Sequence, residues 1–297
     1  MRLIISVITM KYELVVAHRV CPILAKVAVC YDDKLAMVRA TTISLARALN
    51  GIRTKLIVIL DGCDYKYEGL FDSVFANDKV VGVDYELLKT PAIGNHDTYA
   101  KQLELLQAHA SQGQFFYFSE DDYIYKCNAF HEMMDFLQNS DVDFVTPLDH
   151  PDRYRQVIPE SRKVAIKHSK CCHWREVGTT CCTFMTKRQV LIDAGRLLAS
   201  YGNGSCDVAL WLGLTKDCVF RLFSIAIGLC CYVFGKKKDW SRCVAISAWR
   251  YHHVRLFTTR KYRLWGPMPT LAVHLARSSI SPCVEDVLAL TVDGCII

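Results

Sequence analysis

The chain has 297 residues, a formal net charge of +6 at pH 7 and no visible low-complexity tract or internal repeat. A chain of this length can bury one large core or two small ones, and we expect a single globular domain. The mild positive charge suits an anionic small ligand or a membrane surface, whereas no Arg/Lys stripe with interleaved aromatic residues points to nucleic acid.

Fifteen cysteines are present in the chain. Several form adjacent pairs: Cys171-Cys172, Cys181-Cys182 and Cys230-Cys231. Neighbouring cysteines rarely bridge each other, and a chain of this length does not need a disulfide scaffold. Within apolar runs a free cysteine behaves as a small hydrophobic residue. We therefore expect reduced thiols and a cytoplasmic protein.

Two apolar stretches raise the question of targeting or membrane contact. Residues 1–24 are expected to form an N-terminal extension. A cleaved signal peptide is not expected, because Met1–Met10 lacks a basic region followed by a small-residue cleavage site. Val219–Phe234 is shorter than the roughly 20 residues that a spanning helix needs. We expect a buried helix or strand pair there; the alternative is a segment on a membrane face, with the lysines at 236–238 touching anionic headgroups.

Predicted strands and helices alternate along the first half of the chain. Strands are predicted from β-branched and aromatic composition over residues 25–31, 55–60, 79–83, 115–118 and 142–145. Helices are predicted from apolar spacing and stop signals over residues 35–49, 96–110 and 129–137. This alternation indicates an α/β fold with a Rossmann-type, mostly parallel central sheet flanked by helices.

Acidic residues follow three of these predicted strands. They are Asp32, Asp33, Asp61, Asp64, Glu120, Asp121 and Asp122. In a parallel sheet the carboxyl ends of the strands meet at one edge, and ligands bind there. Crowded carboxylates repel one another, and a Mg²⁺ or Mn²⁺ ion holding a phosphorylated ligand would neutralise them. For the triplet at 120–122 alone, a solvated turn after a buried strand is the alternative.

The second half of the chain offers fewer signals. Val177–Met185 is β-prone, small and polar, which would suit the floor of a binding cleft. Asp207 follows a turn-rich loop and precedes the apolar run Val208–Leu212, where an N-cap of a helix is the ordinary role of an aspartate.

The order of these motifs resembles the nucleotide-sugar-binding half of GT-A glycosyltransferases. The resemblance rests on Asp61-Gly62-Cys63-Asp64, on Gly94-Asn95-His96 followed by Ala100-Lys101, and on Glu120-Asp121-Asp122. It covers residues 25–215, most closely up to 150. It implies a single GT-A domain in which residues 25–150 bind the nucleotide sugar. Residues 151–297 would then form the acceptor-binding half and a helical or irregular C-terminal extension.

The resemblance also implies roles for individual residues. The Asp61 to Asp64 turn looks like the family's nucleoside-contacting turn. Glu120-Asp121-Asp122 looks like its DxD-type metal motif, although Ser119 stands where members often extend the acidic pattern. Asp122 would then be the metal ligand, and Glu120 and Asp121 would hold the ribose and metal-bound waters. Asp32, at the end of the first predicted strand, is a further donor contact.

Three further roles are implied beyond that motif. His274 resembles, by position in an apolar helical segment, a late histidine that completes the metal sphere; a core or interface histidine is the alternative. Lys101 is a candidate cation for the diphosphate, with Arg39 and Arg260-Lys261 as alternatives. Asp207, just ahead of a helix, looks like the carboxylate base of an inverting member.

The implied reaction is metal-dependent transfer of a sugar from a nucleotide-diphosphate sugar to an acceptor hydroxyl of a glycan, glycolipid or protein, with inversion. A base must take the proton of the acceptor hydroxyl during its attack on the anomeric carbon. A Mn²⁺ or Mg²⁺ ion and nearby cations stabilise the leaving diphosphate.

Three rival hypotheses remain open from the sequence. A zinc module would use the cluster His168, Cys171, Cys172, His173, Cys181 and Cys182, but the usual spacing of two to four residues is absent. A sugar nucleotidyltransferase would carry a Gly-rich loop after the first predicted strand, where Tyr31–Leu35 has no glycine. A non-catalytic sugar-nucleotide-binding domain would not need Asp207.

Overall fold

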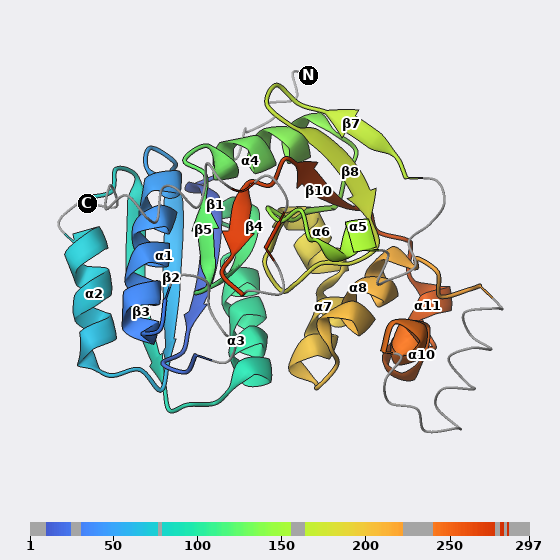
Figure 1. The fold of residues 1–297 in the computed structure, drawn as a ribbon, viewed down its shortest axis with the longest axis horizontal. Helices are drawn as coiled ribbons and strands as arrows, with labels where there is room; N and C mark the ends of the chain where they lie inside the picture. Colours follow the sequence, from blue (N-terminus) through green and yellow to red (C-terminus); the bar gives the residue numbers. More distant parts are fainter. Residues whose placement is uncertain are drawn as a thin grey trace, which may run out of the picture.

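The computed structural model describes residues 10–24, 31–76, 79–155, 164–221, 240–276, 280–281 and 284 (Figure 1). Its main feature is a nine-stranded sheet of order β3-β2-β1-β4-β9-β6-β10-β8-β7, and β11 and β5 form a separate two-stranded sheet. The strands are β1 Tyr12–Val20, β2 Thr54–Asp61, β3 Val83–Thr90, β4 Gly113–Glu120, β5 Tyr123–Tyr125, β6 Phe144–Val145, β7 Ile166–His168, β8 His173–Val177, β9 Phe184–Lys187, β10 Leu264–Met268 and β11 Ala272–His274.

The four long strands β3, β2, β1 and β4 are parallel neighbours. Alternate residues of β1 enter opposite cores, with Leu14 and Val16 on one face of the sheet and Val15 and Ala17 on the other. Strands that are apolar on both faces are typical of parallel sheets covered by helices on both sides. Because these strands are parallel, their carboxyl ends lie along one edge of the sheet.

The other half of the sheet is built from shorter strands of mixed direction. β9 is antiparallel to both β4 and β6, β10 is parallel to β6, and β8 is antiparallel to β10. The chain therefore has the predicted α/β architecture, with a parallel core in its long strands and a mixed continuation that the sequence did not indicate.

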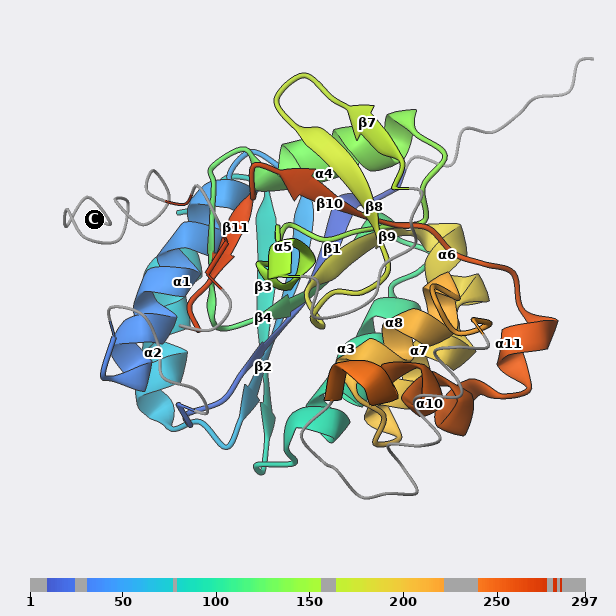
Figure 2. The ribbon, with the colours of Figure 1, turned by 45° about the vertical axis from the view of Figure 1, so that its right-hand side comes forward.

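Helices cover both faces of the sheet (Figures 1 and 2). The helices are α1 Lys34–Leu49, α2 Tyr65–Phe75, α3 Asn95–Ala108, α4 Ala129–Asn139, α5 Asp152–Arg155, α6 Arg188–Asp193, α7 Gly195–Gly202, α8 Asp207–Thr215, α10 Trp240–His252 and α11 Arg255–Thr258. Helices α1, α2 and α4 pack into the core on one face, and α3, α6, α7 and α8 into the core on the other. Helix α10 packs on the outside of α8.

Several predicted elements are confirmed and others are wrong. The predicted helices correspond to α1, α3 and α4, and the strands predicted at 55–60 and 115–118 lie within β2 and β4. The strand predicted at 79–83 is wrong, because β3 starts at Val83. The helical segment expected around His274 is also wrong, since that residue ends strand β11.

The N-terminal part of the chain differs most from expectation. Residues 10–24, placed in an N-terminal extension by the sequence prediction, contain β1, which lies between β2 and β4. Most of the strand predicted at 25–31 and most of the apolar run 219–234 lie outside the described residues. Within the part that is described, no helix is long and apolar enough to cross a membrane.

Candidate functional site

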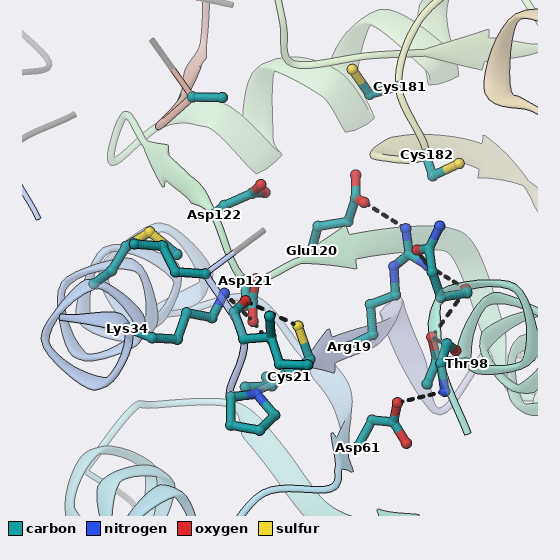
Figure 3. Close-up of a pocket in the computed structure, with 18 of the residues that line it drawn as sticks. Arg19, Cys21, Lys34, Asp61, Thr98, Glu120, Asp121, Asp122, Cys181 and Cys182 are labelled. Atoms are coloured by element: carbon teal, nitrogen blue, oxygen red, sulfur yellow. Dashed lines mark hydrogen bonds and ion pairs between the residues drawn. The ribbon is translucent and has the colours of Figure 1, made fainter. Parts of the chain in front are cut away.

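The carboxyl ends of β1, β2 and β4 open on a cavity of about 540 Å³ (Figure 3). The N-terminal end of α3, the loop between β8 and β9, the start of α8 and strand β11 complete its wall. The predicted site residues in its lining are Asp61, Glu120, Asp121, Asp122, Asp207 and His274. Asp61 and Asp122 therefore lie at the same end of the sheet, as a shared site requires.

Asp61, the last residue of β2, is a buried carboxylate that organises the loop before α3. Its Oδ1 accepts hydrogen bonds from the Thr90 hydroxyl at 2.7 Å and from Ile93 N at 2.6 Å, and its Oδ2 accepts one from Gly94 N at 2.8 Å. These bonds satisfy backbone donors that would otherwise be orphaned at the start of the helix. Asp61 thereby holds the N-terminal end of α3 at the cavity wall.

Glu120, at the end of β4, is neutralised by a residue of the neighbouring strand. Arg19 Nη2 donates to Glu120 Oε1 at 2.5 Å, and the Thr183 hydroxyl donates to Oε2 at 2.8 Å. Arg19 Nη1 also donates to Asn95 Oδ1 at 2.6 Å. Burial, the largest influence, lowers the pKa of the Arg19 guanidinium, but its neighbours, Glu120 foremost, together raise that pKa. The pair is a fixed part of the cavity wall.

Asp121 is neutralised in the same way from the first helix. Lys34 Nζ lies 2.8 Å from Asp121 Oδ2, and both side chains are about nine-tenths buried. Cys21 N donates to the same carboxylate oxygen at 3.0 Å. Burial raises the pKa of Asp121, and Lys34 opposes that rise without cancelling it. Two of the three acids of the triplet are thus paired with cations of the chain itself, which the sequence argument for a metal did not anticipate.

Asp122 pairs with His274, the residue that the family resemblance placed beside it. His274 Nε2 lies 2.9 Å from Asp122 Oδ2. The His274 ring stacks on Tyr123 with centroids 4.8 Å apart and planes 3° from parallel. Burial, the largest influence, lowers the pKa of His274, but Asp122 and, to a smaller extent, Cys181 together raise that pKa well above its ordinary value. Strands β5 and β11, which pair antiparallel, bring the two residues together.

The Asp122–His274 pair offers two side chains that could bind a divalent cation. Among the described residues, no group of three or more His, Cys, Asp and Glu side chains is placed to hold a metal. Mg²⁺-type ions in nucleotide sites commonly use one or two carboxylates together with substrate phosphates and water. Asp122 and His274 fit such a partly substrate-made site, provided that His274 loses its proton, because only the neutral imidazole coordinates.

Asp207 is the first residue of α8, and its own Oδ1 accepts from Val208 N at 2.8 Å. Cys206, not Asp207, is the N-cap residue, so the structure does not support the N-cap role that was the alternative to a base for Asp207. Asp207 lines the large cavity and also a second one of about 70 Å³. His150, Arg153 and Thr180 are among the other residues lining the second cavity. Asp207 and Cys181 are shared by both linings, so this carboxylate stands between the two spaces.

Three residues predicted to contact the donor do not line either cavity. Asp64 is exposed and caps α2 by accepting from Lys66 N at 3.0 Å. Asp32 is exposed just before α1, and Lys101 pairs with Glu104 on the surface of α3 at 2.8 Å. Each of these side chains either contacts a neighbouring residue of its own helix or faces solvent, and so it does not line the cavity.

The cations of the cavity wall are residues that sequence reasoning missed. Arg19 and Lys34 line it, whereas Arg39 is exposed on α1 and Arg260 pairs with Asp143 at 2.6 Å. Arg19 comes shortly after the apolar run Leu14–Ala17, and recognising a strand there would have placed Arg19 at a strand end. The residues of the rival zinc module form no group of three metal-binding side chains in the described structure.

No family model and no curated protein matches the sequence. Solved structures with a similar fold include a nucleotide-diphospho-sugar transferase from Desulfovibrio desulfuricans (11% identity, TM-score 0.42, covering 83% of this chain and 98% of that chain). A 4-diphosphocytidyl-2C-methyl-D-erythritol synthase from Anaerococcus prevotii (9%, 0.36, 65% and 75%) and the galactosyltransferase LgtC (10%, 0.36, 64% and 65%) are also similar. At these identities and scores the likeness extends to the fold alone.

Proposed function

We propose that this protein transfers a sugar from a nucleotide-diphosphate sugar to an acceptor hydroxyl, with a divalent cation and with inversion at the anomeric carbon. The observation that carries the proposal is the single cavity of about 540 Å³ shared by Asp122, His274 and Asp207. Small-molecule sites commonly measure about 300–1,000 Å³, which accommodates a nucleotide sugar.

The donor diphosphate would lie between the start of α3 and the Asp122–His274 pair. Gly94, Asn95 and Thr98 bring the N-terminal end of this 14-residue helix to the cavity. The N-terminal end of a helix carries partial positive charge and favours phosphate groups. Arg19 and Lys34 add positive charge to the wall, although each is already paired with an acid.

Asp122 and His274 would hold the Mn²⁺ or Mg²⁺ ion, which neutralises charge developing on the leaving diphosphate. Their side chains are held ready by the β5–β11 pairing and by the stacking of His274 on Tyr123. The remaining ligands would come from the donor and from water, because the described chain offers no third side chain at this pair.

Asp207 would act as the base. It borders both cavities, so an acceptor hydroxyl entering from the smaller space meets the donor at this carboxylate. Its role would be to take the hydroxyl proton while the oxygen attacks the anomeric carbon from the face opposite the diphosphate. Attack from that face inverts the configuration.

The test is a thermal-shift screen of nucleotide sugars with and without Mn²⁺, followed by assays of donor hydrolysis and transfer. Asp122→Asn should abolish the Mn²⁺-dependent shift and the activity. Asp207→Asn should keep donor binding and lose about 10²–10⁴ in turnover. Asp64→Asn, which changes an exposed acid outside the cavity, is the matched control.

Two results would reject the proposal. If Asp122→Asn binds donor and Mn²⁺ as the wild type does, the metal assignment is wrong. If the protein binds a nucleotide sugar and Asp207→Asn leaves every measured activity unchanged, the chain is a binding domain, as the non-catalytic hypothesis holds.

A further inference from the structure

Three large apolar side chains are exposed together beyond the end of α8. They belong to Phe220, Val254 and Phe257, which are 46%, 59% and 69% exposed. The rings of Phe220, Trp249 and Phe257 contact one another, with centroids 5.6–5.9 Å apart. The aromatic patch consists of Phe220, Trp249, Val254 and Phe257. Other exposed large apolar side chains of the described chain come from separate elements, such as Ile23, Tyr65 and Ile166.

The aromatic patch stands on a fixed base. Trp249 Nε1 donates to Val219 O at 2.8 Å, and Val219, Ala248 and Leu256 are buried beneath it. Helices α10 and α11, which carry Trp249 and Phe257, lie on the side of the molecule away from α1 and α2 (Figure 2). Exposed apolar side chains that cluster in this way mark an interaction site more often than singly scattered ones do.

The charge of the surrounding sequence is strongly one-sided. From Cys218 to Val284 the chain has eleven Lys and Arg residues and one acid, Asp239. The rest of the chain has 25 Lys and Arg residues against 29 acids, so this segment alone makes the protein basic. Such an asymmetry indicates an anionic partner.

Two of these arginines are chain neighbours of patch residues, since Arg250 follows Trp249 and Arg255 follows Val254. Arg250 is exposed and Arg255 is half-buried, and neither forms an ion pair with an acid of the described residues. By contrast, Arg260 and Arg263, further along, pair with Asp143 and Glu176. The positive charge beside the patch is therefore available to a partner.

We propose that the aromatic patch with Arg250 and Arg255 docks on the surface of an anionic lipid bilayer. Exposed aromatic side chains enter the headgroup region, and arginines beside them contact phosphate groups. A second copy of the chain is a poorer occupant, because two basic surfaces repel each other. The lipid contact does not depend on the proposed reaction.

The test is sedimentation of the full chain with phosphatidylcholine vesicles that contain about 30% phosphatidylglycerol, against phosphatidylcholine alone. Binding is expected only to the anionic vesicles and should fall at high salt. Arg250→Gln should weaken it about fivefold, the effect of one basic residue near such a surface. Val254→Ser with Phe257→Ser should weaken it about tenfold or more. Ile166→Ser and Arg196→Gln, which change exposed residues on other elements, should bind as the wild type does.

Several outcomes would overturn the proposal. Equal binding to both kinds of vesicle, or none to either, excludes the anionic surface. Unchanged binding by both Arg250→Gln and the double serine variant places the contact elsewhere. A dimer in ultracentrifugation that the serine variant dissociates assigns the patch to a second copy. Circular dichroism checks that each variant is folded, and Arg250→Gln, which alters only an exposed side chain, keeps the test decisive if the serine variant is not.

Discussion

The ion pair between Lys34 and Asp121 gives the sharpest test of how this chain tolerates an acidic triplet. Replacing Lys34 with Met keeps most of the side-chain volume and removes the charge. Asp121 then remains buried, with Cys21 N as its hydrogen-bond donor at 3.0 Å. The acidic triplet could be neutralised mainly by the chain's own cations or mainly by a bound metal ion. If the chain's own cations neutralise it, Lys34→Met should strongly lower the free energy of unfolding.

The size of the effect follows from the geometry of the pair. At 2.8 Å the attraction is about 6 kcal/mol for an effective dielectric constant of about 20. Removing one partner of a buried pair typically costs about 3–5 kcal/mol, because the other charge is left uncompensated. Asp121 keeps a backbone donor and can take a proton, so we expect the lower end, about 3 kcal/mol at pH 8. A domain stable by about 5–15 kcal/mol stays folded after this loss.

The pH dependence of the loss has a definite sign. Burial raises the pKa of Asp121, so the folded state binds this proton more readily than the unfolded state and the group opposes folding as pH rises. Without Lys34 the pKa of Asp121 rises further. The destabilisation of Lys34→Met should therefore be largest at pH 8 and smaller at pH 5, where Asp121 is protonated.

The assay is urea denaturation of Lys34→Met, Asp121→Asn and the double variant at both pH values. The double variant should recover stability relative to the sum of the single losses, giving a coupling of at least about 1.5 kcal/mol. Lys101→Met is the control, because its partner Glu104 is 66% exposed and such surface pairs contribute about 0–1 kcal/mol. A loss below 1 kcal/mol at pH 8, or the same loss at pH 5, would refute this explanation of the triplet.

Three further predictions concern the cavity and the sheet beside it. Asp61→Ala removes three hydrogen bonds and should cost about 2–4 kcal/mol in urea denaturation, with faster amide exchange in the loop before α3. Gly62→Ala should lower stability by about 1–3 kcal/mol, because Gly62 has φ +68° and a Cβ there would lie 2.8 Å from Ala92 Cβ; an unchanged Tm contradicts this. Burial, then Lys34, lowers the pKa of His18 to about 3, so its folded state stays neutral while the unfolded state gains a proton below pH 6.5. His18 should therefore contribute about 2 kcal/mol to the stability lost between pH 7 and pH 5, and His18→Leu should show a smaller loss.

The local patterns of the first half of the chain were readable without a structure. The apolar spacing of residues 35–49 predicts α1, and the aromatic run at 115–118 predicts β4. The acids after β2 and β4 mark the cavity edge because parallel strands all end there. Strand β1 was missed because its residues were assigned to an extension, although Leu14–Ala17 is a short apolar run rich in β-branched valine.

The sequence did not indicate which basic side chains pair with the acidic triplet. Glu120, Asp121 and Asp122 are consecutive, but their partners are Arg19, Lys34 and His274, which come from β1, α1 and β11. The sequence determined that carboxylates gather at one sheet edge, because strand composition and direction are local properties. Only the tertiary structure decided which cation neutralises each acid and that Asp207 stands between two cavities, because those distances depend on how segments more than 80 residues apart pack together.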